Sequence, residues 1–560
     1  GHSASTTNPR HSSPPLIAHP TDKTLAVSCP SLRRTAAMPN QPPAPFVHVD
    51  AATAADMRRR GMDPHELEQS ARGVLKFVYM CLPDAPAYAA PVLSAHPVPS
   101  DGSEDRISAL PFALLRNIVS RLPAKDAART TALSRRWRPV WRCAPLALAD
   151  AHLLPGALEG LREPLRADTP GLAATVSRAL AAHPGPFRAV HLVGGYYGDA
   201  ARQRELARWV ETFAAKGVQE LVLVNRPWPL DVPLPAALLA VDTLTRLYLG
   251  VWKFPNTSAL PQRVAGAAFP HLRELVLCAM EMESRDLDFL LAGSPVLENL
   301  GIVGSRNKVN RLRLVGQHLR CVQICLCAVD GVAVVDTPCL ERLVLWASRT
   351  NGGSCIRLKI GKAPKLRVLG YLNPGNHMLE IRNTVINAGI KASPSTMVPG
   401  IKILGLNVCF ADHNDAKMLP IFLRCFPNVE TLHFVSEKND KVSGKVNLKF
   451  WLEAGPIESI QSCVKMMTFR EFRLERSEVA FLKFFFQSAQ ILKNAVIVVS
   501  NGSFTSVPTV LSKLKSLIPE TGPCKSCHVL VYESSDPEGG AVWSLQKGFD
   551  FSVTDPLYYR

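Results

Sequence analysis

Apolar residues recur along the chain in a six-residue pattern of apolar-x-x-apolar-x-apolar. Examples are VQELVL from Val218, LRELVL from Leu272 and LERLVL from Leu340, and the first seven copies follow one another at 21–28 residues. This pattern and period are typical of stacked repeats whose short strand carries the apolar positions. One repeat cannot bury its own apolar side chains, so the pattern predicts a solenoid over residues 170–434 in which neighbouring repeats cover one another.

The same pattern reappears at half period in the middle of this region. VNRLRL from Val309, VDGVAV from Val329, CIRLKI from Cys355 and NHMLEI from Asn376 lie between copies of the main pattern. An earlier return segment, ESRDLDFLLAG from Glu283, reads as a helix instead. We therefore predict helical backs in the first repeats and strands on both sides between 297 and 382.

After residue 435 the repeat pattern fades. SEVAFLKFFFQSAQIL from Ser477 and VPTVLSKLKSLI from Val507 predict helices, and AVIVV and HVLVYE predict strands. We interpret residues 435–560 as an α+β unit that covers the last apolar layer of the solenoid.

Alternation along each strand predicts which residues share a face. One column on the main strand face is poor in charge, and its members are Val222, Tyr248, Val276, Gly301, Gln323, Val344 and Gly370. The corresponding column of the half-period strands is Arg313, Ala333, Lys359 and Glu380.

The N-terminal part differs from the repeats. Residues 1–103 are rich in Pro, Ala and Ser and predict a disordered extension with one amphipathic helix over 64–81. A dense apolar stretch follows, in which two helical stripes are predicted. The first contains Leu114, Leu115, Ile118, Val119 and Leu122, and the second contains Leu133, Trp137 and Trp141. A unit of this size cannot bury both stripes alone, so we expect them to contact something outside it.

The composition narrows the possible functions. The net charge is +17, and residues 301–400 hold 14 Lys and Arg against four Asp and Glu, which would attract nucleic acid or an acidic partner. The basic residues are not predicted to converge on the main strand face, so we expect no specific nucleic-acid binding. No apolar run is long enough to cross a membrane. The 14 scattered cysteines suggest reduced thiols in the cytoplasm and/or nucleus.

We find no motif for catalysis. Cys524-Lys525-Ser526-Cys527-His528 matches the haem attachment pattern C-x-x-C-H, but no second Cys pair at zinc spacing or axial partner accompanies it. We therefore predict no enzyme activity, cofactor or metal.

The stretch LPFALLRNIVSRLPAKDAARTTALSRRWRPVW from Leu110 resembles a plant-type F-box covering residues 104–148. FWLEAGPIESIQ and SEVAFLKF are similar to the FBD domain of plant F-box proteins, and the repeats between are similar to leucine-rich repeats (LRRs). The resemblance implies α+β and α/β solenoid architecture: a small all-α F-box hairpin, an LRR solenoid with strands on one or both sides, and an α+β FBD cap.

This resemblance implies a substrate-recognition subunit of an SCF-type ubiquitin ligase, without catalysis of its own. The F-box would bind a Skp-family adaptor, and through it cullin and RING subunits. The implied adaptor contacts are Leu110, Pro111, Leu114, Leu115, Ile118, Leu122, Pro123, Leu133, Trp137 and Trp141. We expect an unidentified target protein on the main strand face, around Tyr248, Val276, Gln323 and Val344. The alternative is an LRR scaffold without ligase function. Phe112 departs from the family pattern, which usually has an acidic or polar residue there.

Overall fold

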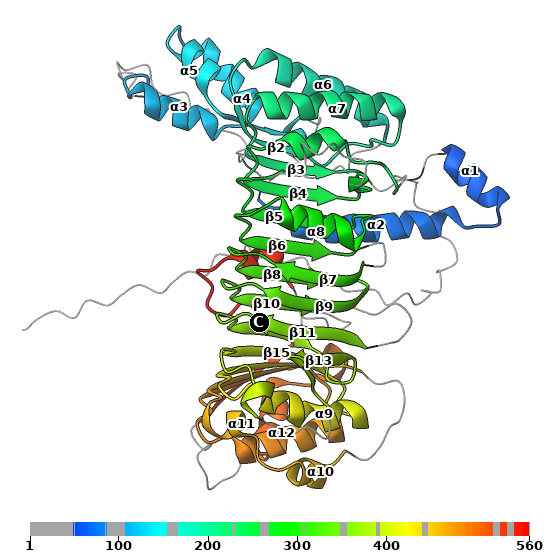
Figure 1. Ribbon diagram of the computed structural model, residues 1–560, viewed down its shortest axis with the longest axis vertical. Helices are drawn as coiled ribbons and strands as arrows, with labels where there is room; N and C mark the ends of the chain where they lie inside the picture. Colours follow the sequence, from blue (N-terminus) through cyan, green and yellow to red (C-terminus); the bar gives the residue numbers. More distant parts are fainter. Residues whose placement is uncertain are drawn as a thin grey trace, which may run out of the picture.

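The computed structural model describes residues 49, 51–84, 86, 107–153, 166–226, 230–257, 268–305, 309–347, 355–387, 393–438, 446–518, 527–534 and 543–558. Figure 1 shows one elongated body in which strands stack along the long axis, with helices α3–α5 at one end and α10–α12 at the other. Most of the predicted N-terminal disorder falls on residues outside the described ranges.

A parallel sheet of 14 strands runs the length of the body. The apolar pattern occurs nine times, starting at residues 218, 244, 272, 297, 319, 340, 366, 401 and 429, and a strand begins two residues into each copy, which confirms the predicted repeats. The strands, in spatial order, are β1 (Leu146–Ala149), β2 (Phe187–Leu192), β3 (Glu220–Val224), β4 (Arg246–Gly250), β5 (Glu274–Cys278), β6 (Asn299–Val303), β8 (Cys321–Cys325), β10 (Arg342–Trp346), β12 (Val368–Leu372), β15 (Ile403–Val408), β16 (Thr431–Ser436), β17 (Met466–Phe472), β18 (Asn494–Val499) and β19 (His528–Glu533).

A second sheet lies on the return side of the middle repeats, as predicted. Its strands are β7 (Val309–Val315), β9 (Val329–Asp336), β11 (Ile356–Lys362), β13 (His377–Ile381) and β14 (Thr384–Val385). The predicted outer column is in register: Arg313 pairs with Ala333, Ala333 with Lys359, and Lys359 with Glu380. The Lys359 ammonium lies 3.0 Å from the Glu380 carboxylate, so part of the basic surplus is neutralised on this sheet.

Helices form the back of the remaining repeats and both ends of the molecule. The helices are α1 (Ala51–Arg59), α2 (Pro64–Cys81), α3 (Phe112–Ser120), α4 (Ala124–Arg129), α5 (Trp137–Cys143), α6 (Thr169–Ala182), α7 (Ala200–Ala215), α8 (Ser284–Ala292), α9 (His413–Arg424), α10 (Leu448–Glu453), α11 (Glu458–Ser462), α12 (Arg476–Ser488), α13 (Val507–Lys515) and α14 (Leu545–Phe549). Short 3₁₀ helices are η1 (Thr130–Ala132), η2 (Asp150–His152), η4 (Arg166–Asp168), η5 (Ala236–Ala240), η8 (Pro394–Thr396) and η9 (Asn501–Ser503).

Helix α2 matches the predicted helix over 64–81. It starts at Pro64, whose fixed φ suits the first helical turn, and the preceding Asp63 carboxylate accepts a hydrogen bond from the His65 amide at 2.9 Å. Leu75, Val78 and Cys81 on one side are buried. Figure 1 shows α2 alongside the sheet, far from the hairpin that follows it in sequence.

The region after 435 has the predicted strands and helices, and its strands prolong the sheet of the repeats. β17 pairs with β16, β18 with β17, and β19 with β18, all in parallel. An aromatic cluster spans the predicted boundary: the Phe410 ring centroid lies 5.1 Å from that of Phe469 and 4.7 Å from that of Phe481. The last repeats and the C-terminal region therefore share one core.

Phe434 in β16 tests this shared core. It is fully buried, and its ring packs edge-on against Phe481 of α12 at 5.2 Å. Replacing it by alanine removes a core aromatic and leaves a cavity, so we expect Phe434→Ala to lower the free energy of unfolding by about 3–5 kcal/mol. Urea unfolding followed by circular dichroism measures the change. The exposed Leu452→Ala is the matched control, with an expected change within about 0.5 kcal/mol.

His377, at the start of β13, makes stability depend on pH. Its Nδ1 accepts a hydrogen bond from the Asn373 amide at 3.2 Å, and burial lowers its pKa from 6.5 to about 4. The unfolded chain therefore binds more protons than the folded one between these values, and stability is lost as pH falls from 6.5 to 4.

We expect His377 to cost about 2–3 kcal/mol at pH 4.5 relative to pH 7.5. Urea unfolding at both values, compared with His377→Gln, isolates this contribution, because the variant keeps an acceptor but does not titrate. An equal loss in the variant would contradict the assignment.

Candidate adaptor-binding surface and strand face

Two prolines mark the starts of helices α3 and α4 in the N-terminal hairpin. Pro111 directly precedes α3 and Pro123 directly precedes α4, each with φ near −53°, which the ring favours and which suits entry into a helix. Pro123 also forms a parallel bridge with Ala147 of β1, so the hairpin joins the edge of the long sheet.

The first predicted stripe divides into two sides. Leu115 and Val119 are fully buried, whereas Leu114 is 52% and Ile118 38% exposed. Adjacent residues on a helix point about 100° apart, so a stripe this wide has an inner and an outer flank. The outer flank, Leu114 and Ile118, is open to a partner.

The remaining predicted adaptor residues also divide. Pro111 is exposed, Leu110 and Leu122 are half-buried, and Pro123 is buried. Leu133 is 66% exposed and lies in the turn before α5.

The tryptophans of the second stripe pack within the chain. Trp137 is buried, and its indole N–H donates to the Ser108 hydroxyl at 2.9 Å. Trp141 is half-buried and its ring packs edge-on against His183 at 5.1 Å. The chain itself covers Trp137, Leu115 and Pro123, and their contact with an adaptor stays a prediction.

The inner flank of the hairpin belongs to the core of the solenoid. Leu115, Val119 and Val140 share one apolar cluster with residues of β1 and α6, among them Leu146 and Val176. The expectation that both stripes need a foreign protein is corrected: the first strand of the sheet completes one side, and the other remains exposed.

The hairpin also carries several exposed basic residues. Arg116, Arg121, Arg135, Arg138 and Arg142 are exposed. Within residues 107–143 the sole acid is Asp126, whose carboxylate lies 3.0 Å from the Arg129 guanidinium. This combination of apolar and basic groups suits a partner with an apolar, acidic surface.

The predicted column of the main strand face is in register but covered. Tyr248 pairs with Val276, and Gln323 with Val344. All four residues expected to bind a target are at most 2% exposed. Tyr248, Val276 and Val344 share a second apolar cluster with Leu75 and Val78 of α2 and with Leu545 and Phe549 of α14. The expected open target surface is therefore absent in this conformation, because two distant segments of the chain cover it.

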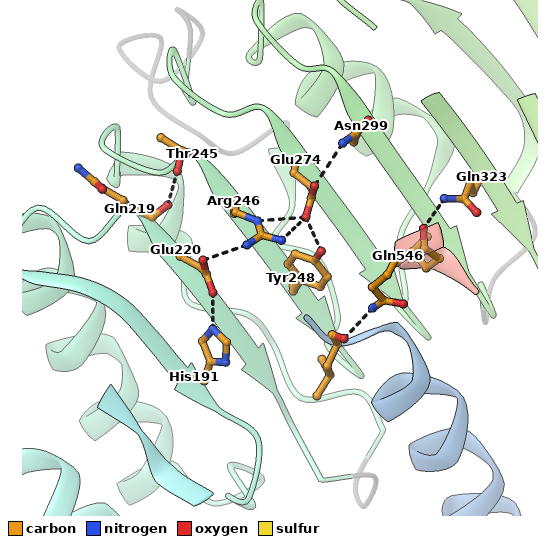
Figure 2. A network of polar contacts seen from close by, with 12 residues as sticks. His191, Gln219, Glu220, Thr245, Arg246, Tyr248, Glu274, Asn299, Gln323 and Gln546 are labelled. Atoms are coloured by element: carbon orange, nitrogen blue, oxygen red, sulfur yellow. Dashed lines mark hydrogen bonds and ion pairs between the residues drawn. The ribbon is translucent and has the colours of Figure 1, made fainter. Parts of the chain in front are cut away.

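A polar network crosses this face from His191, near the C-terminal end of β2, to the first residues of β3, β4, β5 and β6 (Figure 2). The His191 imidazole contacts the Glu220 carboxylate at 2.6 Å, and Arg246 bridges Glu220 at 3.2 Å and Glu274 at 2.9 Å. Burial alone would raise the pKa of Glu220, but the hydrogen bond to His191 and the charge of Arg246 hold it below its usual value. These contacts link the side chains of adjacent strands from β2 to β6.

The same network reaches the neighbouring residues. The Tyr248 hydroxyl donates to Glu274, and Asn299 donates to the other Glu274 oxygen at 3.2 Å. Burial and the Glu274 carboxylate raise the pKa of Tyr248 well above its usual value. Its hydroxyl therefore stays protonated.

Within the described ranges, no cluster of three His, Cys, Asp or Glu side chains is arranged to hold a metal ion. Cys321 and Cys325 are the first and last residues of β8 and Cys327 follows the strand; all three are buried. Cys524 of the C-x-x-C-H sequence lies outside those ranges. No helix in the described part is long and apolar enough to cross a membrane.

Three family models match successive parts of the chain. They are the F-box domain over residues 107–146, the LRR repeats of the FBD-associated F-box protein At5g56370 over 206–434, and FBD over 453–497. The chain therefore contains an F-box domain, LRR repeats and an FBD domain, in that order.

Similar curated proteins support this F-box/LRR/FBD architecture. The chain is 26% identical to the FBD-associated F-box protein At4g13985 of Arabidopsis thaliana, over 77% of this chain and 97% of that protein. It is 23% identical to the putative F-box/FBD/LRR-repeat protein At5g44950 of the same plant, over 76% and 99%. It is 27% identical to the MEIOTIC F-BOX protein MOF of Oryza sativa subsp. japonica, over 62% and 74%.

The division of the F-box residues gives a stability prediction. Trp137→Ala removes a buried indole and should lower the free energy of unfolding by about 3–5 kcal/mol. Leu133→Ala, at an exposed site of the same hairpin, should change it by about 0.5 kcal/mol or less. Chemical denaturation of the two variants beside the unmodified chain measures both. Similar losses in the two would contradict the division.

Proposed function

We propose that this chain is a substrate-recognition subunit of an SCF-type ubiquitin ligase complex. The F-box would bind a Skp-family adaptor, which connects to cullin and RING subunits, and the LRR–FBD body would hold a target protein. The observation that carries the proposal is the exposed flank of the F-box, where Leu114, Ile118 and Leu133 remain uncovered while the opposite flank is packed on the repeats.

The physical basis is an unpartnered apolar surface on a rigid support. Fully burying an exposed leucine or isoleucine side chain contributes about 1.5–3 kcal/mol, and the exposed parts of Leu114 and Ile118 would contribute a share of this. Because the inner flank shares the core of β1, the F-box cannot reorient without disturbing the solenoid. A bound target would therefore be held at a constant position relative to the adaptor.

The contribution of such a subunit is proximity. Tethering a target beside a ubiquitin-charged enzyme raises its effective concentration, while the covalent chemistry occurs on other subunits. No catalytic group in this chain is needed. Cytoplasmic and/or nuclear residence is part of the proposal.

A second candidate is an LRR scaffold that binds protein without an adaptor. The buried Trp137, Leu115 and Pro123 favour it in one respect, since they show that the F-box also serves to close the end of the solenoid. Adaptor binding separates the two functions.

We expect the double variant Leu114→Ala/Ile118→Ala to bind a Skp-family adaptor at least about 100-fold more weakly, because each truncation removes interface contact. Calorimetric titration with purified adaptor gives the affinity, and thermal unfolding shows that the fold is intact. Leu452→Ala, an equally exposed leucine in α10, is the matched control and should bind normally. Absence of adaptor binding by the unmodified chain would favour the scaffold.

A further inference from the structure

The C-terminal strap, residues 543–558, lies across the main strand face as a bound peptide would. It has one short helix, α14, and crosses β8, β10, β12 and β16 with contacts to side chains of each. Trp543, Leu545, Phe549 and Leu557 are buried against the sheet.

The sheet holds the strap largely through its main-chain carbonyls. The Arg342 guanidinium donates to the carbonyls of Gly548 at 2.7 Å, Asp550 at 3.0 Å and Val553 at 2.6 Å. Tyr371 donates to the Leu557 carbonyl at 3.3 Å. Hydrogen bonds to main-chain carbonyls do not depend on the side chains of the bound segment. Peptide-binding proteins obtain much of their affinity from such main-chain hydrogen bonds.

Gln323 fixes the register of the strap. Its amide nitrogen donates to the Leu545 carbonyl at 2.8 Å, and its amide oxygen accepts from the Trp543 indole at 3.0 Å. A side chain at Gly548 would collide with the Gln323 amide, because an added Cβ would lie 2.3 Å from it. The Gln323 amide therefore fits in its place only because residue 548 is a glycine.

Glycines in the strand column leave hollows that the strap fills. A Cβ on Gly301 would lie 2.9 Å from the Leu545 side chain, and one on Gly370 would lie 2.8 Å from that of Leu557. Neighbouring positions of the same column carry Val276 and Val344. The two glycines therefore make room in the column for the two leucines of the strap.

Charged side chains in this groove have partners in the strap. Arg342 is 5% exposed, and Phe551 stacks on its guanidinium at 4.5 Å and on that of Arg320 at 3.7 Å. His433 lies 2.9 Å from the Asp555 carboxylate. A peptide with an aromatic residue and an acid at these positions would satisfy the same groups.

We infer that the strand face from β6 to β16 is a peptide-binding groove occupied in cis by residues 543–558. The inference rests on the proposed target-receptor function and names the partner class: a peptide segment that presents two leucines, an intervening aromatic ring and an acid, as Leu545, Phe551, Asp555 and Leu557 do. Such a target competes with the strap for the same hollows and the same Arg342 and Gln323 donors.

The test separates the strap from its covalent link without truncating the protein. A protease recognition sequence is inserted within residues 535–542 of the full chain, and the purified protein is cleaved there. A fluorescent synthetic peptide of residues 543–558 is then added, and anisotropy reports its binding. We expect saturable binding to the cleaved protein, and binding roughly 100-fold weaker or more to the uncleaved one, because the tethered strap competes at millimolar effective concentration.

Peptide variants leave the groove unchanged and test each contact. Peptides with Leu545→Ala or Leu557→Ala should bind at least about tenfold more weakly, since each loses a buried anchor. A peptide with Thr554→Ala, at an exposed position, is the matched control and should bind as the unmodified one does. A scrambled peptide should not bind.

Two results would overturn the inference. One is that residues 543–560 stay with the cleaved protein through repeated gel filtration and never exchange with labelled peptide. The other is that the variant and scrambled peptides bind as well as the unmodified one. Adaptor titration on the same cleaved sample is independent of the groove, so a failed proposed function is distinguishable from a failed groove.

Discussion

Parallel pairing from β1 to β19 is the constraint on which the rest of the structure depends. It aligns residues from different repeats into rows, so side chains distant in sequence become direct neighbours. Glu220, Arg246 and Glu274 meet because their strands pair in register, with Arg246 opposite both acids. The same register places Gly301 beside Gln323, and so creates a hollow next to a hydrogen-bonding amide. Leucines on the inner side hold these rows together.

The apolar pattern predicts the strands well because each repeat carries its own local signal. Leu272, Leu275 and Leu277 lie in one six-residue copy, and all three are buried. The half-period strands are predicted for the same reason. The direction of pairing after residue 435 is not visible in the pattern, since HVLVYE reads alike in parallel and antiparallel sheets. Its parallel pairing with β18 comes from the register of the preceding strands.

The site is less predictable because its character depends on distant contacts. Leu114 and Leu115 are adjacent and chemically equal, and the position of β1 decides which of them is exposed. Tyr248 and Val276 lie on the predicted face, yet α2 and the C-terminal strap bury them. Gln323 and Leu545 are 222 residues apart, and no periodicity links them. The apolar side chains of 64–81 signalled a helix with a buried side, without indicating what it packs against.

The bridge between Pro123 and Ala147 makes the F-box the first layer of the stack rather than an appendage. With strands spaced about 4.8 Å apart, the 13 intervals of the long sheet span roughly 60 Å from β1 to β19. The length of the sheet is therefore set by the number of repeats. Gain or loss of one repeat would shift the part of the chain that follows it by about 4.8 Å along the stack. It would also rotate that part by the twist between two neighbouring strands. The number of repeats thus sets the distance between the F-box and the C-terminal region without changing either.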